Sequence, residues 1–111
     1  MTFAEIVEKV GGKVAVDVQD AEASCVYVGD LLSDVMGHAG DESVLVTVQN
    51  HLNTIAVCTL VGISVIVICH DRPVPPDMGE AAKREGIAIV TTPLSQYAVA
   101  LALHELPPCE K

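Results

Sequence analysis

Residues 63–92, ISVIVICHDRPVPPDMGEAAKREGIAIVTT, decide the fold. The aliphatic run ISVIVIC (63–69) predicts a buried strand, and IAIVTT (87–92) predicts another. Between them, a pair of prolines opens the helix PDMGEAAKRE (76–85), which Gly86 ends. Two strands that are apolar on both faces and joined by a helix form a βαβ unit. The stretch therefore predicts a parallel sheet.

The same alternation continues on both sides of this unit. The further expected elements are a strand at CVYVGD (25–30), a helix at LLSDVMGHA (31–39), a strand at SVLVTV (43–48), a helix at HLNTIAVCTLV (51–61) with Asn50 as N-cap, and a last helix at LSQYAVALALHEL (94–106). At the start of the chain, the capping-box pattern from Thr2 to Glu5 predicts a helix over 3–10, and KVAVDV (13–18) predicts a short edge strand. The sequence thus predicts one three-layer α/β domain over residues 1–111. It has a mostly parallel sheet of about four core strands alternating with helices, plus an N-terminal helix and a short strand.

Charge and hydropathy exclude two classes of partner. The formal charge is −9, and the six Lys and Arg residues are scattered, so neither nucleic acid nor an anionic membrane surface is an expected partner. The long uncharged segment from Ser43 to His70 raises the alternative of a membrane span. Gly62 interrupts that segment where the pattern changes, which favours a helix, a glycine and a strand.

The four cysteines, at positions 25, 58, 69 and 109, form no CxxC pair, which argues against a zinc ribbon or a thioredoxin-type motif. Cys58 and Cys69 lie within apolar runs and are expected in the core. Because no signal peptide precedes the domain, the sequence favours a cytoplasmic protein with reduced thiols.

Polar residues follow each expected parallel strand. The carboxyl ends of parallel strands share one edge of a sheet, and ligands bind there in α/β proteins. A ligand cleft is therefore expected to be lined by Asp30, Gln49, Asn50, His51, His70, Asp71, Arg72 and Thr92. The alternative is that Asp30, Asn50 and Thr92 only cap helices or meet solvent, whereas Gln49 has no such capping duty.

No motif in the chain identifies a reaction, a metal or a cofactor. His51, His70, Asp30 and Cys69 offer metal-binding atoms, but adjacent residues on an extended chain point to opposite sides, so no metal site is predicted. The glycine patterns of phosphate-binding and dinucleotide-binding loops are absent, as is the nucleophile elbow of hydrolases. The cofactor is therefore unknown.

Two helices carry apolar stripes that are broader than a surface helix needs. Leu52 and Ile55 belong to the stripe of 51–61, and Tyr97 and Leu101 to that of 94–106. Either these stripes are buried within the monomer, or they form the interface of a symmetric homodimer.

Several features follow one another in order between residues 25 and 106. They are Gly29-Asp30, the apolar strand after Gly62, the proline before the next helix, Gly86-Ile87, and Thr92 after the last strand. In these features the chain resembles the DRTGG domain family. The resemblance implies a regulatory, dimer-forming domain of the kind found in HPr kinase/phosphorylase-like proteins, phosphate acetyltransferases and CBS-domain pyrophosphatases. The string Asp-Arg-Thr-Gly-Gly itself is absent. Asp71-Arg72-Pro73 shares only its first two residues with that string and is not equated with it.

The sequence as a whole predicts a non-catalytic regulatory module, either ligand-sensing or protein-binding, that forms a homodimer. Its partner would be a small molecule or a regulatory protein. The first alternative is a small-molecule or nucleotide-binding domain with its ligand at the carboxyl ends of the strands. The second is a small enzyme that uses His51 or His70 as an acid or base near neutral pH.

Overall fold

The computed structural model describes residues 1–109 and contains five helices and five strands within that range. The helices are α1 (Phe3–Val10), α2 (Leu32–His38), α3 (Leu52–Val61), α4 (Pro76–Glu85) and α5 (Gln96–Ala102). The strands are β1 (Lys13–Val16), β2 (Cys25–Val28), β3 (Ser43–Thr47), β4 (Val65–Ile68) and β5 (Ala88–Thr91).

The strands form one sheet in the order β1-β5-β4-β3-β2. Strands β2 to β5 are parallel and lie side by side in chain order. Strand β1 is the antiparallel edge strand, with Lys13 opposite Thr91 and an irregularity between Val14 and Val16. This arrangement confirms the predicted fold class and the predicted edge strand.

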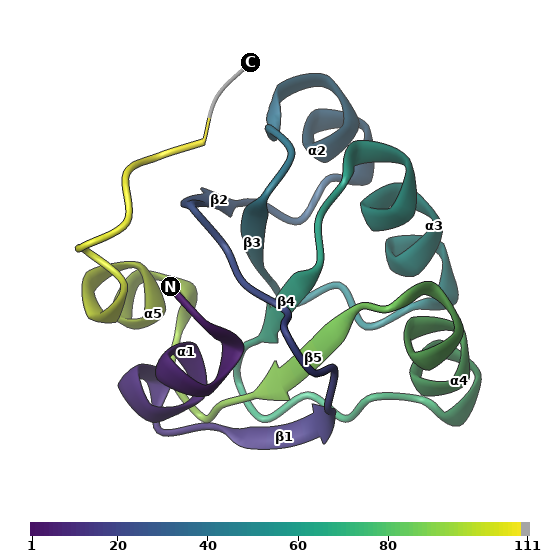
Figure 1. Cartoon of the computed structure of the whole chain (residues 1–111), viewed down its shortest axis with the longest axis horizontal. Coiled ribbons are helices and arrows are strands. Elements are labelled where there is room, and N and C mark those ends of the chain that lie inside the picture. Colours follow the sequence, from purple (N-terminus) through teal and green to yellow (C-terminus); the bar gives the residue numbers. More distant parts are fainter. Residues whose placement is uncertain (110–111) are drawn as a thin grey trace.

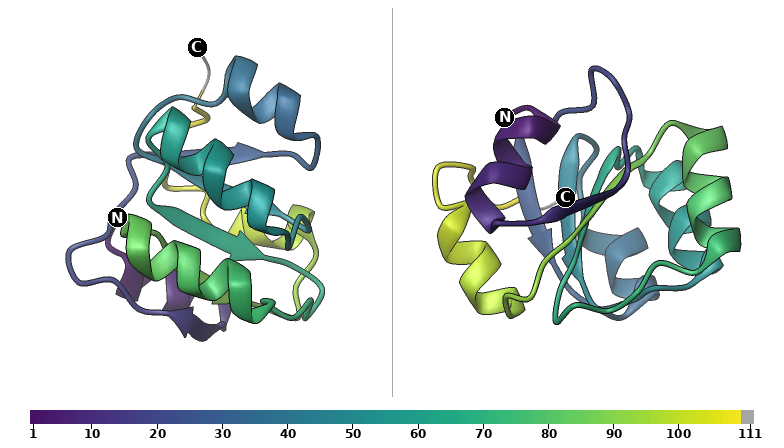
Figure 2. Two further views of the ribbon diagram at one scale, coloured as in Figure 1. Left: turned by 90° about the vertical axis from the view of Figure 1, so that its right-hand side faces the viewer. Right: turned by 90° about the horizontal axis from the view of Figure 1, so that it is seen from below.

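Helices cover both faces of the sheet, so the domain has three layers (Figures 1 and 2). Helices α2, α3 and α4 lie on one face, and α1 and α5 lie on the other. Along β4, Ile66 and Ile68 pack toward the first group, whereas Val65 and Val67 pack toward the second. Every residue of β4 is fully buried, and burying one such side chain contributes about 1.5–3 kcal/mol. The continuous aliphatic runs are thus the centre of two cores.

The expected helix ends are also present. Thr2 and Glu5 form a complete capping box at α1. Glycines in the left-handed conformation end α1, α3 and α4, at Gly11, Gly62 and Gly86. Because Gly62 separates α3 from β4, the uncharged segment is a helix and a strand. Within residues 1–109 no helix is long and apolar enough to span a membrane.

Two local predictions were wrong. The last helix is shorter than expected, because Ser95 caps its start through a bond from Ala98 N and tight turns follow Ala102. Asn50 is not the N-cap of α3. That position belongs to His51, and the Asn50 side chain donates instead to the carbonyl oxygen of Pro73 at 2.8 Å.

Candidate functional site

The carboxyl ends of the parallel strands meet at one edge, where Asp30 is the centre of a hydrogen-bond network. Its Oδ1 atom accepts from Thr47 Oγ1 at 2.9 Å, from Val48 N at 2.9 Å and from Gln96 Nε2 at 3.0 Å. The Gln49 amide donates to the backbone oxygen of Asp30 at 2.7 Å. Asp30 and Gln49 therefore hold the loops after β2 and β3 and the start of α5 together.

Two further residues of the expected cleft have polar atoms that bond within the chain. Thr92 is fully buried, and its hydroxyl donates to the carbonyl oxygen of Val10 at 2.8 Å and accepts from Leu94 N at 3.2 Å. The Asn50 bond to Pro73 links the loop after β3 to the loop after β4. Thr92 is thus placed away from solvent, and Asn50 is placed as a connector between loops.

His51 and His70 lie on exposed positions of the same edge. Within residues 1–109 neither imidazole forms a hydrogen bond to another group. The backbone of His70 and Asp71 is left-handed, with φ of 59° and 53°. Their amides donate to the carbonyl oxygens of Leu94 (3.0 Å) and Thr92 (2.9 Å), which fixes this turn beside the loop after β5. Non-glycine residues in such conformations cost about 1–3 kcal/mol each and are concentrated at functional sites.

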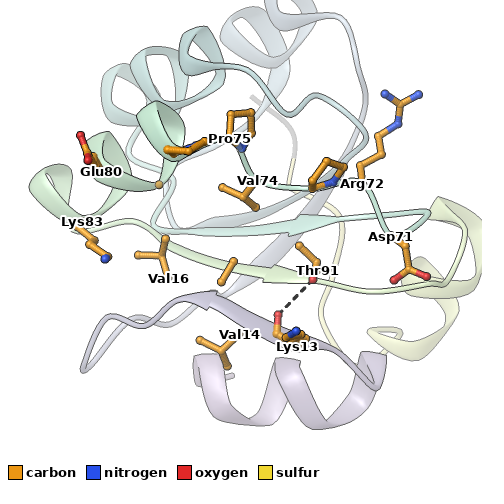
Figure 3. Close-up of a pocket in the computed structure, with 14 residues that line it drawn as sticks. Lys13, Val14, Val16, Asp71, Arg72, Val74, Pro75, Glu80, Lys83 and Thr91 are labelled. Atoms are coloured by element: carbon orange, nitrogen blue, oxygen red, sulfur yellow. Dashed lines mark hydrogen bonds between the residues drawn. The ribbon is translucent and has the colours of Figure 1, made fainter.

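Of the eight expected residues, Asp71 and Arg72 line a cavity. It is a groove of about 490 Å³ between β1 and α4, bordered by the loop of residues 71–75. Its apolar walls come from Val14, Val16, Val74 and the prolines of that loop (Figure 3). The volume is within the range of about 300–1,000 Å³ that is typical of small-molecule sites.

Two cationic residues of this groove, Lys13 and Lys83, were not predicted from the sequence. Lys13 reaches the carboxyl edge because β1 runs antiparallel and pairs Lys13 with Thr91. Lys83 lies on the face of α4 that borders Val16 (Figure 3). The sequence did predict the short edge strand that contains Lys13. Residue types alone could not show that this strand pairs with β5, which is what brings Lys13 to the groove.

The groove concentrates positive charge in an acidic chain. It is lined by three of the six Lys and Arg residues, Lys13, Arg72 and Lys83, and by the acidic residues Asp71 and Glu80. Lys13 and Lys83 lie toward opposite ends, and the Arg72 guanidinium points away from β1 (Figure 3). Among residues 1–109 none of these three cations forms an ion pair. Its lining thus carries a net positive charge on a chain of charge −9.

Lys9, by contrast, already has an acidic partner. It forms an ion pair with Glu105. The hydrogen bond to Glu105 and its negative charge raise the pKa of Lys9, and the hydrogen bond from Lys9 and its positive charge lower the pKa of Glu105. The N-terminus of α4 is also occupied. Pro76 has no amide proton, and the Asp77 carboxylate accepts from Met78 N at 2.8 Å. An anion in the groove would therefore meet side-chain cations rather than the end of the helix.

Metal binding has no support in the described part of the chain, where no three His, Cys, Asp or Glu residues are grouped to hold an ion. Cys58 and Cys69 are buried as expected, and burial raises their pKa to about 12 and about 11. The expectation of four reduced thiols is wrong for the other two, because Cys25 and Cys109 form a disulfide with Cα atoms 5.0 Å apart.

The four expected interface residues do not share one surface. Ile55 is only 2 % exposed and belongs to the core beneath α3, so it is not available to a partner. Leu52 is exposed on α3, whereas Tyr97 and Leu101 are exposed on α5, on the opposite side of the sheet (Figure 1). The two helices therefore offer separate candidate surfaces.

No family model and no curated protein sequence matches the chain. Among solved structures, it is similar to the CBS and DRTGG domains of the regulatory region of Clostridium perfringens pyrophosphatase, complexed with the activator diadenosine tetraphosphate. The TM-score is 0.71 at 14 % identity, over 96 % of this chain and 47 % of that chain. The likeness is one of fold, and this chain spans about half the length of its neighbour.

Proposed function

We propose that the chain is a regulatory, ligand-sensing module without catalysis, and that its ligand is an elongated anionic small molecule bound between β1 and α4. The observation that carries this proposal is the set of cations around the groove. Lys13, Arg72 and Lys83 come from three separate segments, and none has an ion-pair partner within residues 1–109. The two acidic residues of the lining, Asp71 and Glu80, balance only part of this positive charge, and a bound anion would neutralise the rest.

The arrangement of the groove favours particular ligand chemistry. Because Lys13 and Lys83 lie toward opposite ends, a ligand that met both would carry negative charge along its length, as a polyphosphate chain does (Figure 3). Arg72 would join them by rotating its side chain toward β1. The valine and proline walls would contact an apolar part, such as a nucleoside. The activator bound by the structural neighbour, diadenosine tetraphosphate, supports trying nucleotides first.

The loop that borders the groove gives binding a route to the rest of the domain. Asp71 and Arg72 follow the left-handed turn, and that turn is hydrogen-bonded to residues just before α5. A ligand that shifted this turn would therefore also shift Thr92 and Leu94, which lead into α5. This connection is why we assign the groove a sensing role rather than simple storage.

A thermal-shift screen tests the proposal, using mono- and dinucleoside polyphosphates, sugar phosphates and inorganic phosphate. We expect polyphosphates to raise the melting temperature and added salt to reduce the effect. Lys83→Gln should abolish the shift. Arg84→Gln is the matched control, because Arg84 is the adjacent residue of α4 but borders the groove between α3 and α4. A flat screen, or equal loss in both variants, would contradict the proposal.

A second candidate function is self-association through α3. Seven of the ten residues of this helix are apolar, yet its buried residues are Thr54, Ile55 and Cys58 alone. Leu52, Ala56 and Leu60 lie four residues apart on its outer face, and Leu60 is 75 % exposed. An uncovered apolar helix face is typical of an interface, and a twofold dimer is the commonest solution.

Sedimentation of charged variants tests this second candidate. We expect a dimer at micromolar concentration that Leu60→Glu converts to folded monomers. Tyr97→Glu is the matched control, because Tyr97 is 74 % exposed but lies on α5, across the sheet. Dissociation by Tyr97→Glu alone would move the interface to α5, and a monomeric wild-type chain would remove the candidate.

A further inference from the structure

The end of the described chain lies along the outer edge of β2. Val26 N donates to the carbonyl oxygen of Pro107 at 2.9 Å, and Cys109 N donates to the carbonyl oxygen of Val26 at 2.9 Å. Residues 107–109, here called the tail, therefore add a short parallel bridge to the sheet at Val26 (Figure 1). Two of its three residues are prolines without amide donors, so these two backbone bonds are its pairing with β2.

The two edges of the sheet are protected in different ways. The edge strand β1 has an irregularity between Val14 and Val16 and a lysine at its start, both of which discourage pairing with another strand. Strand β2 is regular throughout its pairing with β3. Its outer edge is covered by the tail instead. Release of the tail would leave unpaired backbone groups at Val26, next to the exposed side chain of Val28.

A covalent bond holds the tail in this position. Cys25, the first residue of β2, and Cys109 form a disulfide that joins positions 84 residues apart. Cys25 is half-buried, whereas Cys109 is buried, so the Cys25 sulfur is the more accessible of the two. The other two cysteines are buried in the core and far less acidic than usual, which keeps them out of thiol exchange.

We infer that Cys25 and Cys109 form a reversible thiol–disulfide latch, which holds the tail on the edge of β2 when oxidised and releases it when reduced. A dithiol reductant would open the latch. Its thiolate attacks the Cys25 sulfur, a mixed disulfide forms, and Cys109 leaves as a thiolate that takes up a proton. The second thiol of the reductant then displaces Cys25, which is protonated, and the reductant departs as its own disulfide.

The surroundings of the two sulfurs suit the reduced state as well as the oxidised one. The carbonyl oxygen of Asp41 is 3.9 Å from the Cys25 sulfur and 3.8 Å from the Cys109 sulfur, and that of Glu42 is 3.9 Å from Cys25. Each thiol therefore has a carbonyl oxygen as a hydrogen-bond acceptor, so opening the disulfide leaves neither S–H group without a partner. In a reducing compartment the tail would depend on its two backbone hydrogen bonds and its small buried contact.

Amide hydrogen exchange on the full chain, in oxidised and dithiothreitol-reduced samples, tests the latch. We expect the amides of Val26 and Cys109 to exchange at least about tenfold faster after reduction, with no change in β4, because opening is local. Mass spectrometry of the oxidised sample should identify the Cys25–Cys109 cross-linked peptide.

Two variants complete the experiment. Cys109→Ser should show the fast exchange under both conditions. Cys58→Ala retains the pair and should remain redox-dependent. Exchange that is equally slow in the reduced protein and in Cys109→Ser would overturn the latch, as would the absence of the cross-linked peptide.

Discussion

Asp30 Oδ1 accepts a hydrogen bond from Gln96 Nε2 at 3.0 Å, which joins the end of β2 to the first residue of α5 across 66 positions of sequence. The same oxygen also accepts from Thr47 Oγ1 and from the amide of Val48. One carboxylate thus organises three segments at the carboxyl edge of the sheet. These hydrogen bonds by themselves account for its position there.

The first prediction is that Asp30→Ala destabilises the domain. Thr47 is fully buried, so its hydroxyl proton loses its acceptor while its oxygen still accepts from Gln49 N, and we expect a cost of about 1–3 kcal/mol. Gln96→Ala should cost about 1 kcal/mol or less, because it removes a single bond at a half-buried side chain. Urea unfolding measures both. Equal losses would show that Thr47 and Val48 find other acceptors.

The second prediction concerns the buried hydroxyl of Thr92, which ties β5 to the end of α1. Thr92→Val keeps the shape but removes the hydrogen bonds to the Val10 oxygen and from Leu94 N, and should lower the free energy of unfolding by about 1–2 kcal/mol. Thr91→Val is the matched control. The Thr91 hydroxyl is only half-buried and bonds Lys13 O at 3.4 Å, so its loss should change stability by less than about 0.5 kcal/mol.

The sequence was sufficient for elements whose signals are local. The two prolines that open α4 and the glycine at 86 mark both ends of that helix, and the aliphatic runs mark β4 and β5. It could not place contacts that depend on distant partners. Nothing around Lys13 shows that β1 pairs with β5, and 84 residues separate Cys25 from Cys109. Three of the six lysines and arginines line the groove, and only the folded structure shows that they lie there together.

Sequence patterns that do not separate polar from apolar positions were also uninformative. Helix α3 is mostly apolar and has no clear polar face, so residue types could not tell that Ile55 faces the sheet while Leu60 faces solvent. Asp30, Asn50 and Thr92 were recognised as polar strand-end residues that need not meet a ligand. Asn50 bonds to Pro73 and Thr92 bonds to Val10. Both partners lie in other segments, so they could not be identified from neighbouring residues.

The third prediction is the thiol reactivity of the folded chain. At about pH 8, iodoacetamide should label Cys25 and Cys109 after mild reduction and neither before it. Cys58 and Cys69 should resist in both states, because burial raises their pKa to about 12 and about 11 and few thiolates form. Mass spectrometry counts the labels. Rapid labelling of Cys58 or Cys69 without denaturant would contradict this assignment.

The fourth prediction follows from the ion pair between Lys9 and Glu105. Pairing lowers the pKa of Glu105 below its ordinary value of 4.5, so its stabilising effect is present above that value and is lost as pH falls through the lower, folded-state pKa. Glu105→Gln should therefore flatten the fall of the melting temperature on acidification. The effect should be small and weaken with salt, because both side chains are well exposed. Parallel curves for the two proteins would contradict it.

The fifth prediction links the turn before β1 to the groove. A Cβ atom at Gly12 would lie 2.3 Å from Val90 Cγ2 and 2.9 Å from the backbone oxygen of Thr91, so Gly12→Ala must push β1 away from β5. Overpacking of this kind costs about 1–3 kcal/mol. The displacement would also move Lys13 from its place beside Thr91, so any polyphosphate-induced thermal shift should weaken.

Gly37 provides the control for this substitution. It lies within α2 with nothing near the position of a Cβ atom, and Gly37→Ala should raise stability by about 0.5–1 kcal/mol. Its effect on the ligand-induced shift should be nil, since α2 is remote from the groove lining. If Gly12→Ala lowered the melting temperature but retained the full ligand shift, Lys13 would not contact the ligand. The anion would then have to be held by Arg72 and Lys83 alone.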